Sequence, residues 1–209
     1  MIVYRKVRQD ELDQAAELLT KSFQGYSFFN MYAGNKIKKE AFLHAIQEVS
    51  VKTAYKKHTV LAGANDKGIV SLAQLKPPHK SEAGFLDYLL GGGMKIMLAG
   101  GIKNTLELLK MNEEATAACH NQSGRVWYLS ALAVSSFHQG QGLGSKMLHD
   151  CIIPYIEKRG GGLLTLITNT EKNRLFYKKN GFEEFDGIIL RRNGKVLGNW
   201  SYRMNIEKK

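Results

Sequence analysis

One stretch, residues 126–145, constrains the fold more than any other part of the chain. Its first half, VWYLSALAV, is a short apolar run typical of a strand that is covered on both faces. The turn QGQGLG follows, and apolar residues at helical spacing then predict a helix over residues 145–158. A glycine turn at a helix N-terminus leaves backbone N–H groups uncovered, which suits a phosphate group. The same spacing also fits a plain tight turn.

The glycine pattern excludes two common nucleotide sites. No Lys-Ser or Lys-Thr pair follows the turn, so it is not the phosphate loop of a nucleoside triphosphatase. The glycines follow Gly-x-Gly-x-Gly, and no acidic residue stands about twenty positions later, because residues 163–170 form another apolar run. A dinucleotide-binding fold is therefore not expected.

Two motifs in order resemble those of the GNAT acyl-CoA N-acyltransferases. Leu132-Ala133-Val134 followed by QGQGLG is similar to the family's first motif, whose loop reads Gln/Arg-x-x-Gly-x-Gly/Ala. The apolar run 163–170, then Tyr177 and Asn180-Gly181-Phe182, resembles the strand–helix unit that ends in Tyr-x-x-x-Gly-Phe. The resemblance covers about residues 127–185.

The remaining elements are compatible with that family. Period-two and helical patterns predict strands over residues 1–8, 58–64, 69–75, 183–191 and 196–206, and helices over 11–23 and 37–55. Asp10 is expected to cap the first helix, and Asn193-Gly194 to turn the last hairpin. We expect an α/β fold, with a mixed, mostly antiparallel central sheet flanked by helices, in a single domain over residues 1–209.

A connection of about fifty residues, 76–125, departs from a minimal member of the family. Its apolar residues predict helices over 85–90 and 94–111, broken by glycines at 91–93 and at 100 and 101. It is expected to be a helical insertion between the third and fourth strands. It either covers the acceptor side of the site or forms a surface for a second subunit, which would make a homodimer.

Composition narrows the partners. The 209 residues carry a net charge of +11, but the basic residues are scattered, which favours a solvated surface over a nucleic-acid face. No apolar run reaches the length of a membrane span, and no signal peptide is evident. The two cysteines, Cys119 and Cys151, are expected to be free thiols, so we expect a cytoplasmic protein without nucleic-acid or membrane partners.

The resemblance implies acetyl-CoA as cosubstrate and assigns residues to it. The coenzyme-binding residues it implies are Leu132, Ala133, Val134, Gln139, Gly140, Gln141, Gly142, Leu143, Gly144, Ser145, Asn169 and Asn173. Tyr177 would be the general acid that protonates the departing thiolate, and the alternative for it is a core tyrosine. Asn169 or Thr170 would otherwise cap a helix. The aromatic segment 23–34 would help to wall the acceptor site.

The general base and the acceptor stay open at this level. Many relatives carry a glutamate on the strand before the glycine loop, and here Ser130 is the polar residue of that strand. Further candidates in the insertion are His79, Glu82, Asp87 and His120, and no cluster at metal-ligand spacing is found. The resemblance implies direct N-acetylation of a primary amine on a small molecule. Alternatives are a coenzyme-binding regulator without turnover and a protein or peptide N-acetyltransferase.

Overall fold

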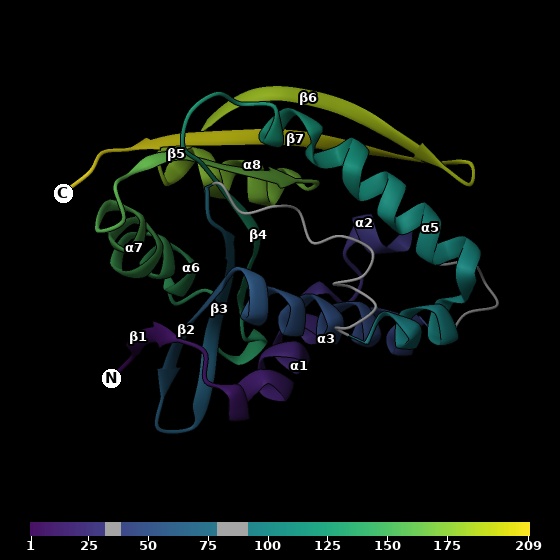
Figure 1. Cartoon of the computed structure of the whole chain (residues 1–209), viewed down its shortest axis with the longest axis horizontal. Helices are drawn as coiled ribbons and strands as arrows, with labels where there is room; N and C mark the ends of the chain where they lie inside the picture. The colour runs from purple at the N-terminus through teal and green to yellow at the C-terminus, as the bar shows by residue number, and fades with distance from the viewer. Residues whose placement is uncertain (32–38, 79–91) are drawn as a thin grey trace.

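The computed structural model describes residues 1–31, 39–78 and 92–209, and it is built around one twisted sheet (Figure 1). The strand order is β1-β2-β3-β4-β5-β7-β6, in which only β4 and β5 pair in parallel. The strands are β1 (Val3–Lys6), β2 (Thr59–Asn65), β3 (Gly68–Lys76), β4 (Val126–Val134), β5 (Gly162–Thr168), β6 (Glu183–Arg192) and β7 (Lys195–Ile206). The mixed, mostly antiparallel sheet is thus confirmed.

Alternating side chains bury both faces of this sheet. Leu61 of β2 and Leu166 of β5 pack on one face, and their neighbours Val60 and Ile167 pack on the other. Helices α1 (Leu12–Phe23), α3 (Lys39–Lys57) and α5 (Gly93–His120) cover the second face. The helical stretch 143–157 and α8 (Glu171–Lys179) cover the first face. This double cover explains why β4 reads as an almost continuous apolar run.

The helix after the glycine loop begins two residues earlier than expected. It consists of α6 (Leu143–Lys146), a π-helical segment η3 (Met147–Ile152) and α7 (Ile153–Glu157). Pro154 lies inside this stretch and has no N–H to give to a carbonyl one turn earlier. A widened turn just before a proline is a usual way for a helix to continue past it.

In the part that the structure describes, the long connection consists of two helical segments that meet at a kink at Gly101, within the predicted glycine break. Helix α5 runs on to His120, beyond the expected end at Met111, and bends at Gly101, where φ is +79°. It packs against α3 at its beginning and runs beside β5, β6 and β7 (Figure 1). The helix predicted over residues 85–90 lies outside the described residues.

The two predicted hairpins, β2–β3 and β6–β7, are confirmed. The helix cap predicted at Asp10 is wrong. Asn193 and Gly194 both have positive φ, as the tight turn between β6 and β7 requires. Asp10, however, gives no side-chain cap to α1, because a short 3-10 turn (Gln9–Glu11) precedes the helix. Its neighbour Glu11 takes the structural role instead.

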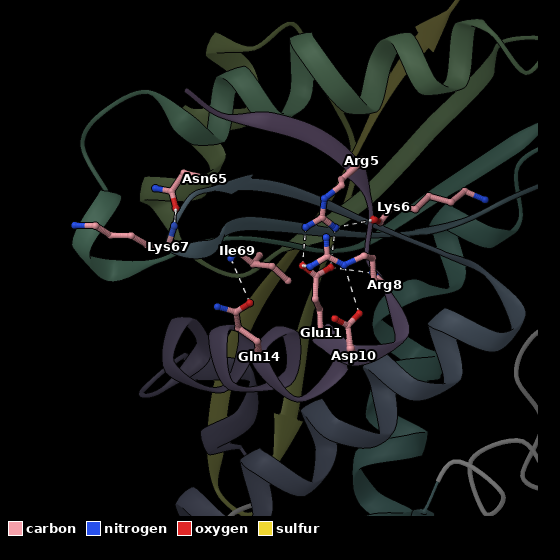
Figure 2. A network of polar contacts seen from close by, with 9 residues as sticks. All are labelled: Arg5, Lys6, Arg8, Asp10, Glu11, Gln14, Asn65, Lys67 and Ile69. Atoms are coloured by element: carbon pink, nitrogen blue, oxygen red, sulfur yellow. Dashed lines mark hydrogen bonds and ion pairs between the residues drawn. The ribbon is translucent and has the colours of Figure 1, made fainter.

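Glu11 joins the first strand to the first helix. Figure 2 shows Arg5 and Arg8 gathered around its carboxylate. Arg5 donates two hydrogen bonds to it, at 2.7 and 2.6 Å, and the backbone N–H of Arg8 donates a third at 2.9 Å. The Glu11 side chain is only 8% exposed, and these donors lower its pKa from 4.5 to about 2.

We therefore expect Glu11→Gln to lower the free energy of unfolding at pH 7 by about 2 kcal/mol. A lowered folded-state pKa contributes stability that is complete above pH 4.5 and is lost as the pH falls towards 2. Urea titrations at several pH values should show the difference from wild type shrinking below pH 4.5.

The matched control is Glu17→Gln, which breaks an exposed pair with Lys21. It should cost about 0.5 kcal/mol or less. Equal losses in the two variants, or a Glu11 difference that grows in acid, would contradict this role for Glu11.

Candidate active site

The middle of the sheet opens where its two parallel strands part. β4 and β5 are paired only from Val126 to Tyr128 and from Leu163 to Thr165. Beyond these residues β4 stays with β3 as far as Val134, while β5 stays with β7 as far as Thr168. Two strand edges therefore face each other without pairing, which leaves room for an extended ligand between them.

A bulge in β4 lies where the opening begins. Gln74 of β3 is opposite Ala131, and Leu75 is opposite Leu129, so Ser130 is the extra residue. Its hydroxyl donates to the backbone carbonyl of Gln74 at 3.2 Å. A bulge bends its strand and increases the local twist, which turns the end of β4 away from β5.

The register shows which backbone groups of β4 face the opening. The N–H of Ser135 donates to the carbonyl of Val70 on β3 at 2.9 Å. Val134 and Ser71 are therefore a non-hydrogen-bonded pair, in which the backbone N–H and C=O of Val134 point away from β3. Leu132 and Ala73 form a second pair of this kind, so the Leu132 N–H also points away from β3. The N–H of Ala133, between Leu132 and Val134, points at β3. Leu132 and Val134 thus present donors along the open edge.

The glycine loop lies at the end of β4 and is exposed. Gly140 and Gly142 have φ values of +78° and +73°, and a Cβ on either would meet only open space. Gly142 begins the helix, and no side chain caps it. Uncapped N–H groups and the positive end of the helix dipole then face outward from Leu143, Gly144 and Ser145.

The rest of the loop holds this arrangement in place. The Gln139 side chain donates back to the carbonyl of Val134 at 3.3 Å. Gly144 packs against Phe176 of α8, where a Cβ would come within 3.1 Å of the ring. Gln141 is exposed at the tip, and Leu143 is buried beneath it. The loop can therefore offer its backbone to an anion without rearrangement of the core.

A cavity of about 290 Å³ adjoins the opening. β4 contributes residues 128–132 to its wall, and the other side of the opening contributes Thr168, Asn169, Asn173 and Tyr177. The remaining wall comes mainly from α1, α2 (Ser27–Asn30), α3, α5 and the end of β3. Among the residues predicted from sequence, the cavity brings together Leu132, Asn169, Asn173 and Tyr177. Ala133, Val134 and residues 139–145 are not part of its wall.

Tyr177 is both a core residue and a cavity residue. Its ring packs edge-on against Phe176 and Phe182, and the residue is 8% exposed. Burial, and secondarily the nearby Tyr26, raises the pKa of its phenol well above the ordinary value of 10.0. Tyr177 therefore keeps its proton throughout the physiological pH range.

Asn169, just after β5, forms hydrogen bonds with β7 and with Tyr26. Its side chain donates to the carbonyl of Gly198 at 3.0 Å and to Asn199 Oδ1 at 3.1 Å. Its backbone N–H donates to the Tyr26 hydroxyl at 3.0 Å. The amide of Asn169 is thus already engaged, and Thr170, not Asn169, caps α8 by accepting from Asn173 N–H. A role for Asn169 and Asn173 in coenzyme binding stays a prediction.

The cavity wall contains both aromatic and basic side chains. Phe23, Tyr26, Phe28 and Phe29 line it, as expected for the aromatic segment. Lys76 and His120 also line it, and neither Asp nor Glu is found among the described lining residues. Of the possible bases named from sequence, His120 and Ser130 lie in this wall, whereas His79, Glu82 and Asp87 fall outside the described residues.

Burial lowers the pKa of His120 to about 4, and the charge of Lys76 adds to this effect. We expect the imidazole to titrate near pH 4 in NMR spectra, not near 6.5, so that it is neutral at pH 7. Lys76→Met should raise the pKa only partly, since burial is the larger cause. A wild-type pKa close to 6.5 would contradict the burial of this ring.

Sequence reasoning missed several polar cavity residues, among them Thr53, Gln74 and Lys76. These three carry no motif signal, and only the fold brings α3 and the end of β3 to this wall. Across the described parts of the chain, no three or more His, Cys, Asp or Glu side chains gather as a metal ion would need. Nor is any helix in those parts both long and apolar enough to cross a membrane.

Comparisons with known proteins agree with this geometry. Residues 106–184 match the family model of the acetyltransferase (GNAT) domain. No curated protein sequence matches the chain. The fold resembles a histone acetyltransferase HPA2-related acetyltransferase of Corynebacterium glutamicum, with TM-score 0.68 and 18% identity over 96% of this chain and 94% of that one.

Two animal enzymes share the fold over nearly the whole chain. The Drosophila melanogaster polyamine N-acetyltransferase, which forms N-acetylagmatine, has TM-score 0.62 and 17% identity over 98% of this chain and 100% of its own. Arylalkylamine N-acetyltransferase 2 of Aedes aegypti has TM-score 0.64 and 13% identity over 99% of both chains. At these identities the likeness concerns the fold alone.

Proposed function

Because residues 106–184 match the family model of the acetyltransferase (GNAT) domain and the fold resembles that of solved acetyltransferases, we propose that the chain is a GNAT N-acetyltransferase. In this proposal it transfers the acetyl group of acetyl-CoA directly to a primary amine of a small molecule. One observation carries this proposal. The opening between β4 and β5 has a phosphate-suited glycine loop at one end and adjoins the cavity at the other. A long cosubstrate and a small acceptor would meet at Leu132 and Tyr177.

The residues present fit acetyl-CoA. The uncapped start of α6 and the open space above Gly140 and Gly142 suit the pyrophosphate. The outward N–H groups of Leu132 and Val134 suit the amide carbonyls of an extended arm, which would add to β4 as a further strand. An N–H at Leu132 would also polarise the thioester carbonyl.

The cavity favours an acceptor with one amine and an aromatic or apolar body. Its described wall holds four aromatic residues of the segment 23–29, a lysine and no carboxylate. A polycation such as agmatine would need acidic partners there, so the arylalkylamine acceptor named for the Aedes enzyme is the better chemical guide. Burial beside Lys76 lowers the pKa of a bound amine, which would keep it neutral and nucleophilic.

The reaction then needs little acid–base help from the chain. The amine nitrogen attacks the thioester carbon, the new C–N bond forms, and the C–S bond breaks. The departing thiolate takes a proton, for which Tyr177 is the proposed donor. The ammonium that forms on nitrogen releases its proton to solvent in the cavity.

Acetyl-CoA binding tests the coenzyme site without knowledge of the acceptor. Calorimetric titration should give one-to-one binding, and Gly142→Glu should weaken it about tenfold or more, since the carboxylate would repel the pyrophosphate. Gly124→Glu is the matched control, because Gly124 is exposed, has φ of +84° and lies outside the loop. Equal weakening in both variants, or no binding at millimolar acetyl-CoA, would overturn the assignment.

Measurement of kcat tests the proposed role of Tyr177 as the general acid. Tyr177→Phe should lower kcat by about 10²-fold or more and leave acetyl-CoA affinity nearly unchanged, because only the hydroxyl is removed. Tyr155→Phe is the control, since the Tyr155 hydroxyl contacts Thr59 outside the cavity. An unchanged kcat in Tyr177→Phe would contradict the role of Tyr177. Binding without any thiol release over an amine panel would instead favour the coenzyme-binding regulator.

A further inference from the structure

Two buried polar atoms in the cavity wall lack a partner. In the part of the chain that the structure describes, the Thr53 hydroxyl and the Gln74 side-chain nitrogen form no hydrogen bond. The two residues are 5% and 2% exposed, and both line the cavity. Burying such a group without a partner costs about 1–3 kcal/mol, so folded proteins rarely leave it unsatisfied unless a ligand supplies the partner.

The two atoms belong to one cluster. Ser50 donates to Gln74 Oε1 at 3.0 Å, which fixes the amide at one end. Either orientation of that amide leaves its other end unpaired. Ser50 and Thr53 are three residues apart on α3, so they are neighbours on the same helix face. Gln74 is opposite Ala131 in β4, one residue from Leu132 and the opening.

Two buried threonine hydroxyls outside the cavity do have hydrogen-bond partners. Thr116 donates to the carbonyl of Asn112 at 2.9 Å, and Thr165 donates to that of Trp127 at 3.1 Å. Both residues are as buried as Thr53, and neither lines the cavity. Among the buried threonines that the structure describes, Thr53 alone has an unpaired hydroxyl, although Ser201 Oγ and His138 Nδ1 are also unpaired outside the cavity.

We propose that Thr53 and Gln74 form a subsite for a hydroxyl oxygen of the acceptor, so that the acceptor is a phenolic arylalkylamine. This inference rests on the proposed function. A hydroxyl oxygen accepts from the Gln74 amide, and its proton can be donated to Thr53 Oγ1. The aromatic wall would hold the ring, and the amine would point towards the thioester at Leu132.

Matched acceptors test the subsite. We expect kcat/KM for tyramine or 3-hydroxyphenethylamine to exceed that for 4-methylphenethylamine and phenethylamine by about tenfold or more, because the apolar compounds leave both groups unpaired. Thr53→Val and Gln74→Met should each reduce this ratio by about three- to tenfold. Thr116→Val, the same change outside the cavity, should leave the ratio as it is.

Thermal unfolding without ligand separates binding from structure. Thr53→Val removes an unpartnered hydroxyl and should keep or raise Tm, whereas Thr116→Val removes a bonded one and should lower it. A Tm loss in Thr53→Val equal to that in Thr116→Val would overturn the subsite. So would equal kcat/KM for tyramine and phenethylamine in the wild type.

If the proposed function itself is wrong, the experiments give a different result from a failure of the subsite alone. In that case the protein neither binds acetyl-CoA nor releases thiol with any amine. Calorimetric binding of tyramine and phenethylamine to the protein alone then still tests the subsite, with tighter binding of tyramine expected. An active enzyme without preference for the hydroxyl contradicts the subsite alone.

Discussion

The site depends on a limit to pairing between two parallel strands. β4 is held by β3 along its whole length and β5 by β7, but they share only three residues with each other. The bulge at Ser130 adds twist to β4, while β5 pairs with β7 without a register shift. The sheet therefore opens at its centre, and the amides of Leu132 and Val134 are left to bind something other than a strand.

The elements around the opening give the cavity its character. The Tyr26 hydroxyl accepts from the backbone N–H of Asn169 at the end of β5, and the aromatic residues that follow α1 line the same cavity as Tyr177. Helix α5 completes the opposite wall and ends at His120, which packs edge-on against Tyr128 of β4. Because the described wall carries Lys76 and no carboxylate, it disfavours a second positive charge in the bound molecule. Under the proposed function, charge and shape would select the acceptor, and the opening would hold the cosubstrate.

The sequence predicted the parts of the fold that local chemistry determines. The Asn193-Gly194 turn requires positive φ, and the run from Val126 to Val134 must be covered on both faces, so these features could be read directly. Tyr177 and Asn173 were placed by motif, and the cavity does include them. The contribution of Glu11 could not be read, because its partner Arg5 lies on another element. Thr53 and Gln74 were missed for the same reason, since only the packing of α3 against β3 brings them together.

Residue-resolved hydrogen exchange with and without acetyl-CoA would test the central claim, that the opening between β4 and β5 holds the extended arm of the cosubstrate. The account predicts that acetyl-CoA slows exchange at the N–H groups of Leu132 and Val134. The Ala133 N–H, which already points at β3, should change little. Saturating acetyl-CoA that leaves Leu132 and Val134 unprotected, or that protects all three amides equally, would contradict it.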